Sequence, residues 1–288
     1  MTVVCGTDFS ESAARAADAA AAFASAWNED LVLVHALEVP GAEEAGSWSL
    51  LEAERGRAES RLAAEAARLA VSGVPVRTQV QIGASDTSLI AVAAERRARL
   101  IAVGALGRRG GSLWRLGSTA DRVAQTSKLP VLVVREADSI AGWARAGRKL
   151  EVLVGVDRSP SSDAAVAWVA DLESAGTCHV TCGHVFWPPE VGGKLPAGPE
   201  AERALAAELR ARIAALRGGK PFDLRLVGGL GRPADHLVRM AEEARADLVV
   251  VGANPRTLIS RFWHGSVSRG VIDESPRNVV CVTDPGPE

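Results

Sequence analysis

Apolar and polar positions follow two different patterns along the chain. Short runs rich in Val, Leu and Ile are typical of buried strands, and the longer stretches between them, rich in Ala, Glu and Arg, have the spacing of helices. In the first half of the chain, the short runs predict strands near residues 2–7, 30–37, 75–82, 99–104 and 130–135. Strands that alternate with helices indicate strand-helix units built around a parallel sheet.

This pattern occurs twice. The opening stretch "VVCGTDFSESAARAA" is answered by "VLVGVDRSPSSDAAVAW" from Val152. At an offset of 148 or 149 residues the equivalent pairs are Asp8 and Asp157, His35 and His184, Gly104 and Gly252, and Gly117 and Gly265. An internal repeat of this length predicts two copies of one domain. We therefore expect an α/β chain of two tandem, open, five-stranded parallel sheets with helices on both faces.

The same pattern sets the expected boundaries. Residues 1–136 and 150–288 are the two predicted domains, and residues 137–149, "ADSIAGWARAGRK", are a predicted linker because they show no strand and no strong helix pattern. Ser10 and Ser159 are the predicted N-caps of the first helix of each copy, and Pro160 suits the first helical position. The long segments from Glu38 and from Trp187 are predicted surface insertions.

Composition and charge exclude several classes of partner. The chain has 288 residues, of which 47% are hydrophobic, and a formal net charge of -2 with a pI near 6.3. It therefore has no broad basic field for nucleic acid and no charge run for a membrane surface. The most apolar helical stretch, "AADAAAAFASAW", carries Asp18 and is too short to span a bilayer. With no export-signal pattern at the N-terminus, residence in the cytoplasm is expected.

The cysteines do not indicate a metal site. All four lie in apolar, strand-like surroundings: Cys5, Cys178, Cys182 and Cys281. Cys178 and Cys182 are four residues apart, which along a strand is about 13 Å and too far for two thiolates to bind one zinc ion. We expect buried, reduced cysteines and no metal ligands.

A glycine-rich stretch, "VGALGRRGGSLWRLGST", follows the fourth predicted strand of the first copy. In open parallel sheets ligands bind at the carboxyl ends of the strands, beside the point where the strand order switches, and both Asp8 and Gly104 lie at such ends. Gly104 and Gly107 are expected to bring backbone N–H groups close to a ligand, with access to positive φ.

Two kinds of ligand group suit these residues. Gly117, Ser118 and Thr119 open a helix, whose N-terminus attracts phosphate without a basic side chain. The carboxylate of Asp8 suits ribose hydroxyls or a base amine. Glycines at a strand-to-loop turn can also serve the turn alone, and it is their combination with Asp8 and the helix start that favours a nucleotide site.

The spacing of Gly104, Gly107, Gly117 and Ser118 resembles the G-x2-G-x9-G-[ST] motif of ATP-binding members of the universal stress protein family. The resemblance covers nearly the whole chain, through "CGTD", "VGVD" and the terminal strands "LPVLVV" and "NVVCVT". It implies a Rossmann-like fold of the adenine nucleotide alpha hydrolase-like type. It also implies that Asp8 contacts ribose or adenine, that the backbone around Ala36 and Val103 lines the adenine, and that the phosphates are held by Gly104, Gly107, Gly117, Ser118 and Thr119.

The second copy departs from that motif. Its equivalent positions are Asp157, Val185, Gly252, Gly265, Ser266 and Val267. Pro255 stands where Gly107 stands in the first copy, and proline has neither an N–H to donate nor access to positive φ. A weaker or lost second site is expected.

The resemblance implies a nucleotide-dependent stress-response or regulatory protein that binds ATP. Mg²⁺ is expected with the ATP, because the triphosphate carries more negative charge than one helix end can balance. The alternatives are an interaction module without a ligand and a slow ATP hydrolase. The loop from Gly104 to Thr119 has no lysine, metal-holding carboxylate or base, so no catalytic residue is assigned. The apolar last strands are expected to pair with one another across the two copies, and the chain is expected to form a homodimer.

Overall fold

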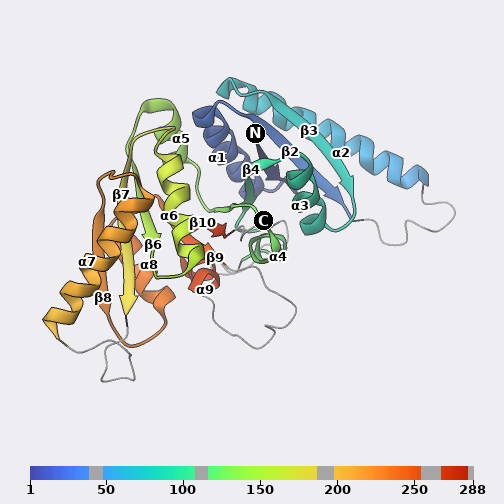
Figure 1. Cartoon of the computed structure of the whole chain (residues 1–288). Coiled ribbons are helices and arrows are strands. Elements are labelled where there is room, and N and C mark those ends of the chain that lie inside the picture. The colour runs from blue at the N-terminus through green and yellow to red at the C-terminus, as the bar shows by residue number, and fades with distance from the viewer. Residues whose placement is uncertain (39–47, 108–115, 187–197, 254–266, 285–288) are drawn as a thin grey trace. The chain divides into compact units, whose positions relative to one another are not determined.

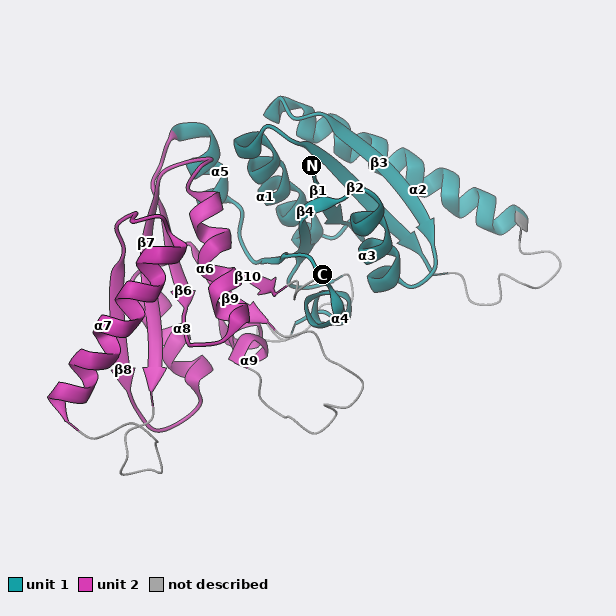
Figure 2. Ribbon diagram, in the orientation of Figure 1, with its two compact units in different colours: residues 1–146 teal, residues 147–288 magenta. Residues whose placement is uncertain are grey.

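The protein, in a computed structural model, forms two compact units (Figures 1 and 2). The structure describes residues 1–38, 48–107, 116–186, 198–253 and 267–284. The first unit comprises residues 1–146 and the second residues 147–288. Each unit is an α/β fold with a parallel sheet, as the sequence predicts.

The sheet of the first unit has the strand order β3-β2-β1-β4-β5, with all pairs parallel. Its strands are β1 Thr2–Gly6, β2 Asp30–Leu37, β3 Val76–Ile82, β4 Ala98–Gly104 and β5 Val131–Val134. Each predicted boundary is confirmed to within one residue. The order runs one way from β1 to β3 and the other way from β4 to β5, so the switch point lies between β1 and β4.

Helices cover both faces of this sheet (Figure 1). They are α1 Glu11–Trp27, α2 Trp48–Leu69, α3 Ser85–Glu95, α4 Ser118–Thr126 and α5 Asp138–Ala146, with a short 3₁₀ turn η1 at Ala70–Ser72. Helices α1 and α2 pack on one face, and α3 and α4 on the other. Between Ala16 and Ala24 every residue of α1 except Asp18 is buried, since alanine lets its neighbours approach closely.

The structure adds helices to two segments in which the sequence pattern indicated none. Residues 137–149, the predicted linker, contain α5. Its Ile140 and Trp143 are buried, and the Trp143 ring lies with its centroid 5.6 Å from that of Phe23 in α1. Apolar positions three residues apart were the available signal, and a helix of nine residues with Gly142 in it makes that signal weak.

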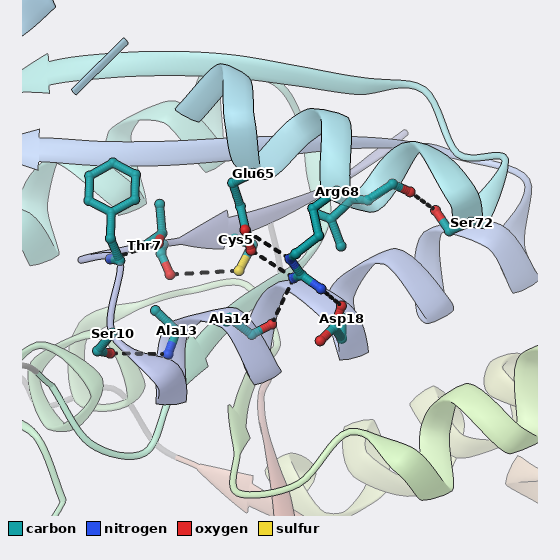
Figure 3. A network of polar contacts seen from close by, with 12 residues as sticks. Cys5, Thr7, Ser10, Ala13, Ala14, Asp18, Glu65, Arg68 and Ser72 are labelled. Carbon is teal, nitrogen blue, oxygen red and sulfur yellow. Dashed lines mark hydrogen bonds and ion pairs between the residues drawn. The ribbon is translucent and has the colours of Figure 1, made fainter. Parts of the chain in front are cut away.

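The predicted insertion from Glu38 is the second case. Residues 39–47 lie outside the described residues, but the rest of this stretch is α2, which buries Leu62 and Leu69 against the unit. Arg68 of α2 also bonds across to α1 (Figure 3), with 2.7 Å from Nη1 to a carboxylate oxygen of Asp18 and 3.4 Å from Nη2 to the Ala14 carbonyl. This helix is therefore part of the core of the unit.

The second unit repeats the arrangement in the order β10-β9-β6-β7-β8, again all parallel. Its strands are β6 Leu150–Gly155, β7 Cys178–Phe186, β8 Asp223–Gly228, β9 Leu248–Ala253 and β10 Asn278–Thr283. Its helices are α6 Pro160–Leu172, α7 Pro199–Leu216, α8 Pro233–Glu243 and α9 Val267–Glu274. The stretch from Trp187, also predicted to be an insertion, includes α7, which buries Leu205, Leu209 and Ile213.

The predicted N-caps are confirmed in both units. Ser10 Oγ accepts a hydrogen bond from the Ala13 N–H at 3.2 Å (Figure 3), and Ser159 Oγ accepts one from Ser162 at the same distance. Pro160 is the first residue of α6. In the described part of the chain, no helix is long and apolar enough to cross a membrane.

The four thiols are free, and Cys178 alone among them is half-buried. Burial raises the pKa of Cys178, Cys182 and Cys281 to about 12, and it raises the pKa of Cys5 as well. The folded protein therefore favours the neutral thiols.

This gives a pH prediction. Because the folded-state pKa values lie above the ordinary value of 9.0, the stability that the thiols contribute is complete below pH 9 and is lost as the pH rises toward 12. Alkylation by iodoacetamide at pH 8 should be slow in the native chain and fast in urea. Rapid alkylation of native Cys182 would contradict the prediction.

A close contact between a strand end and a helix occurs in both units. A Cβ atom on Gly104 would lie 2.6 Å from Ser12 Oγ and 2.7 Å from the Ser12 carbonyl oxygen, and one on Gly252 would lie 2.5 Å from the Ser161 carbonyl group. Real Cβ atoms do not come so close to backbone, so only glycine fits at these strand ends.

Gly104→Ala should therefore destabilise the first unit by about 1 to 3 kcal/mol, because α1 must move away from the sheet. Gly56→Ala is the matched control, since Gly56 lies in α2 with nothing within 4 Å of the new methyl group. This control should raise stability by up to about 1 kcal/mol. Thermal unfolding measures both, and midpoint shifts of the same sign would contradict the packing argument.

Candidate functional site

The carboxyl end of β1 is fixed to β2 by a histidine. The Thr7 N–H donates to the Val34 carbonyl at 2.9 Å, and His35 Nδ1 lies 2.7 Å from the Thr7 carbonyl oxygen. The second unit has the same pair of bonds, with His184 Nδ1 at 2.7 Å from the carbonyl of Val156. Both histidines hold a strand end, so they position the residues that come directly after that strand.

Asp8 comes next in the chain and lies beside Gly107, in the glycine loop that joins β4 to α4 (residues 105–117). Its Oδ1 accepts a hydrogen bond from the Ser10 N–H at 3.0 Å, which fixes the carboxylate at the start of α1. Its Oδ2 lies 3.3 Å from where a Cβ on Gly107 would be. Residues far apart in sequence are thus brought together at the switch point between β1 and β4.

Phe9 was not singled out by the sequence, and it has a left-handed backbone with φ 64°. For a bulky residue this conformation costs about 1 to 2 kcal/mol. Its ring lies 4.5 Å from that of His35 between centroids, and the guanidinium of Arg61 from α2 lies 4.0 Å above it. This stack holds the turn that carries Asp8, and no sequence signal marks a non-glycine residue in this conformation.

The two ends of the glycine loop meet. The Gly117 N–H donates to the Ala105 carbonyl at 2.8 Å, and a Cβ on Gly117 would lie 3.4 Å from the Gly107 nitrogen. The Leu106 N–H donates to Ser12 Oγ at 3.2 Å, so the loop leaves the sheet over the start of α1. Gly107, Gly117 and Asp8 therefore surround one place, and residues 108–115 lie outside the described residues.

The reason for these glycines differs from the expected one. None of Gly104, Gly107 and Gly117 has a positive φ, so the expectation of positive φ at Gly104 and Gly107 is wrong. Space is the constraint instead, with Gly104 against Ser12 and Gly107 against Asp8. Proline at the equivalent position of the second unit would therefore lose the N–H but no special backbone conformation.

Helix α4 begins without a side-chain cap. Gly117 is its N-cap, with φ −66° and ψ 145°, and has no side chain to accept a helix N–H. Ser118 is exposed and Thr119 half-buried, and Thr119 Oγ1 lies 2.8 Å from Ser85 Oγ of α3. The first N–H groups of an uncapped helix are suited to bind an anion.

The two residues expected beside the adenine lie on the strands that flank β1. Val103 on β4 is buried, and its side chain packs near Gly6. Ala36 on β2 is half-buried. Both lie one residue before the carboxyl ends of their strands, β2 and β4, on either side of the strand that Asp8 follows.

The second unit differs at the equivalent places. Asp157 is exposed, and its Oδ1 accepts a hydrogen bond from the Ser159 N–H at 2.7 Å. Val185 is half-buried on β7, and Val267 opens α9 with 37% exposure. Gly252 packs on Ser161, whereas Pro255, Gly265 and Ser266 lie outside the described residues. Within the described ranges no group of three or more His, Cys, Asp or Glu side chains is arranged to hold a metal ion.

Comparison with known proteins agrees with this fold. A sequence model of the universal stress protein family matches residues 1–135 and 151–283. A universal stress protein of Mycolicibacterium smegmatis is 29% identical over 97% of this chain and 96% of its own, and one of Mycobacterium tuberculosis is 27% identical over 94% and 92%.

Among solved structures, a universal stress protein from Archaeoglobus fulgidus shares the fold. Its TM-score is 0.77 at 19% identity, and 98% of each chain is covered. Each matched segment lies within one of the two units. The chain therefore belongs to the universal stress protein family and carries two tandem copies of its domain.

Proposed function

We propose that the first unit binds ATP or a close adenine nucleotide, with Mg²⁺, and that the protein is a nucleotide-dependent regulator in a stress response. The convergence of Asp8, Gly107 and Gly117 beside the uncapped start of α4 carries this proposal. Membership of the family supports it.

Each group has a distinct chemical task in this proposal. Phosphate oxygens accept hydrogen bonds from the first N–H groups of α4 and from the hydroxyls of Ser118 and Thr119. Asp8 repels phosphate and accepts hydrogen bonds from ribose hydroxyls or the adenine amine instead. Gly107 and Gly117 leave the room between these two ends, and the backbone of Ala36 and Val103 lines the base.

Mg²⁺ is part of this proposal because the negative charge of the triphosphate has to be balanced. The triphosphate carries more negative charge than the partial positive charge of one helix end, about half an elementary charge, can balance. A hydrated Mg²⁺ bound chiefly by the phosphates supplies the rest. With no lysine from Gly104 to Thr119, the site is suited to hold the nucleotide and poorly suited to hydrolyse it.

The second unit is proposed to bind the nucleotide more weakly or not at all. Pro255 removes an N–H donor, and a charge-assisted hydrogen bond contributes about 1.5 to 3 kcal/mol. Asp157 is also more exposed than Asp8, so a ligand there would be less enclosed. The two copies of one fold would then have different ligand affinities.

Calorimetric titration with ATP tests both parts. The parent chain should show one tight binding event, and Asp8→Ala should weaken it at least tenfold, whereas Asp157→Ala should leave it unchanged. Asp157→Ala is a matched control, because each carboxylate bonds the serine N–H two residues on and each variant loses that same structural bond.

Two other results would favour the alternative functions. No binding of ATP, ADP or AMP at millimolar concentration would leave the chain as an interaction module without a ligand. Release of inorganic phosphate from ATP at a rate that Asp8→Ala removes would support the hydrolase instead.

We also propose that β5 and β10, the outermost apolar strands of their own sheets, pair across the two units, and that the chain forms a homodimer. Exposed apolar edge strands invite pairing, and within its own unit each of these strands has a neighbour on one side, β4 or β9. Light scattering should give twice the chain mass of 30.0 kDa, and NMR relaxation should give one tumbling time for both units. Independent tumbling of the units would contradict the pairing.

A further inference from the structure

Two hydroxyl groups join the helices α3 and α4 in the first unit. Ser85 is the first residue of α3 and Thr119 the second residue of α4, and their oxygens lie 2.8 Å apart. Both side chains are half-buried. The hydroxyl proposed to meet a phosphate is thus already bonded to a neighbouring helix.

Ser85 itself is fixed to the end of β2. Gly83 turns the chain from β3 into α3 with φ +133°, and its N–H donates to the Leu37 carbonyl at 3.0 Å. The N-cap of α3 is Ala84, which offers no side-chain acceptor, and the Ser85 N–H instead donates to a carboxylate oxygen of Glu38 at 3.0 Å. A continuous set of hydrogen bonds therefore runs from the end of β2 through Ser85 to Thr119.

The second unit replaces both hydroxyls at once. At the equivalent positions it has Pro233, which has no N–H and no hydroxyl, and Val267. The neighbouring pair changes too: Arg122 and Asp86, 3.1 Å apart in the first unit, become Gly270 and Ala234. A Cβ on Gly270 would lie 2.6 Å from that of Ala234, so α8 and α9 meet through small apolar groups.

The comparison of the two units shows whether the fold itself needs these hydroxyls. The same helix pair packs in both units, so the fold needs neither hydroxyl. The hydroxyl pair occurs in the unit whose site is proposed to be intact, and it lies in the first turn of the helix proposed to bind phosphate.

We propose that Ser85 is a positioning residue for the phosphate end of the nucleotide in the first unit, an inference that rests on the proposed function. Ser85 donates its hydroxyl proton to Thr119 Oγ1, which aims the Thr119 proton at a phosphate oxygen. A hydroxyl has one proton and two lone pairs, so Thr119 can accept from Ser85 and donate to the phosphate together. Through Glu38, the same bonds tie the phosphate end to β2, which carries Ala36.

The test is calorimetric titration of the full chain with ATP and, separately, with adenosine. Ser85→Ala should weaken ATP binding about three- to tenfold, the equivalent of one hydrogen bond, and leave adenosine binding unchanged. Thr119→Val, which introduces the residue found at position 267, should have at least the same effect. The double variant should bind ATP no more weakly than Thr119→Val alone. Ser85→Thr, which keeps a hydroxyl at position 85, should bind ATP as the parent does.

Arg122→Gln is the matched control. It breaks the ion pair between Arg122 of α4 and Asp86 of α3 but removes neither hydroxyl, so the affinity of this variant for ATP should stay within twofold of the parent's. Amide hydrogen exchange without ligand provides a second measurement. Ser85→Ala should speed exchange of the Asp121 N–H, which donates to the Gly117 carbonyl at 2.9 Å and closes the first turn of α4.

The outcomes distinguish the two proposals. If the parent chain binds no nucleotide, the proposed function fails and this inference fails with it. If the parent binds ATP but Ser85→Ala weakens ATP and adenosine equally, or neither, the proposed function stands and the positioning role is overturned. Unchanged exchange of the Asp121 N–H in Ser85→Ala would overturn it as well.

Discussion

The site depends on the close approach of a strand end to the backbone of the first helix. Gly104 lets α1 come so near that Ser12 fills the place of a side chain, and Ser12 Oγ in turn accepts the Leu106 N–H. That bond sets the direction in which the loop leaves β4. Because the direction is set there, Gly107 arrives beside Asp8 and Gly117 beside Gly107.

The two units show which parts of this arrangement belong to the fold alone. The glycine against the serine backbone, the histidine at the strand end and the serine N-cap occur in both units. The stacked Phe9 and the Ser85 and Thr119 hydroxyls occur in the first unit, with Arg158, Pro233 and Val267 in their places in the second. The glycine at position 252 is therefore explained by its packing against Ser161, and it is weak evidence for a ligand site in the second unit.

Much of the fold could be predicted from the sequence because its strands are buried on both faces and read as uninterrupted apolar runs. The repeat gave a second copy of each signal, and the serine N-caps follow from local chemistry. Helix α5 was missed because nine residues with one glycine carry little pattern, and its stability comes from the Trp143 contact with α1.

Asp8 and the glycines could be located in the sequence, but the reason for the glycines could not. Whether a glycine supplies a positive φ or simply room depends on the atoms beside it, and those come from other segments. The left-handed Phe9 and the bond between Ser85 and Thr119, residues 34 positions apart, are likewise set by tertiary contacts that no local pattern encodes.

Because of helix α5, the first unit is longer than the segment that matches the family. The family match ends at residue 135, yet the first unit continues to residue 146, and the Phe23 side chain in α1 depends on Trp143 for part of its cover. A chain that ended at Glu136 would keep the repeat whole but lack the aromatic partner of Phe23 in α1. The smallest piece of this chain that keeps the Trp143 contact is thus longer than the segment that matches the family.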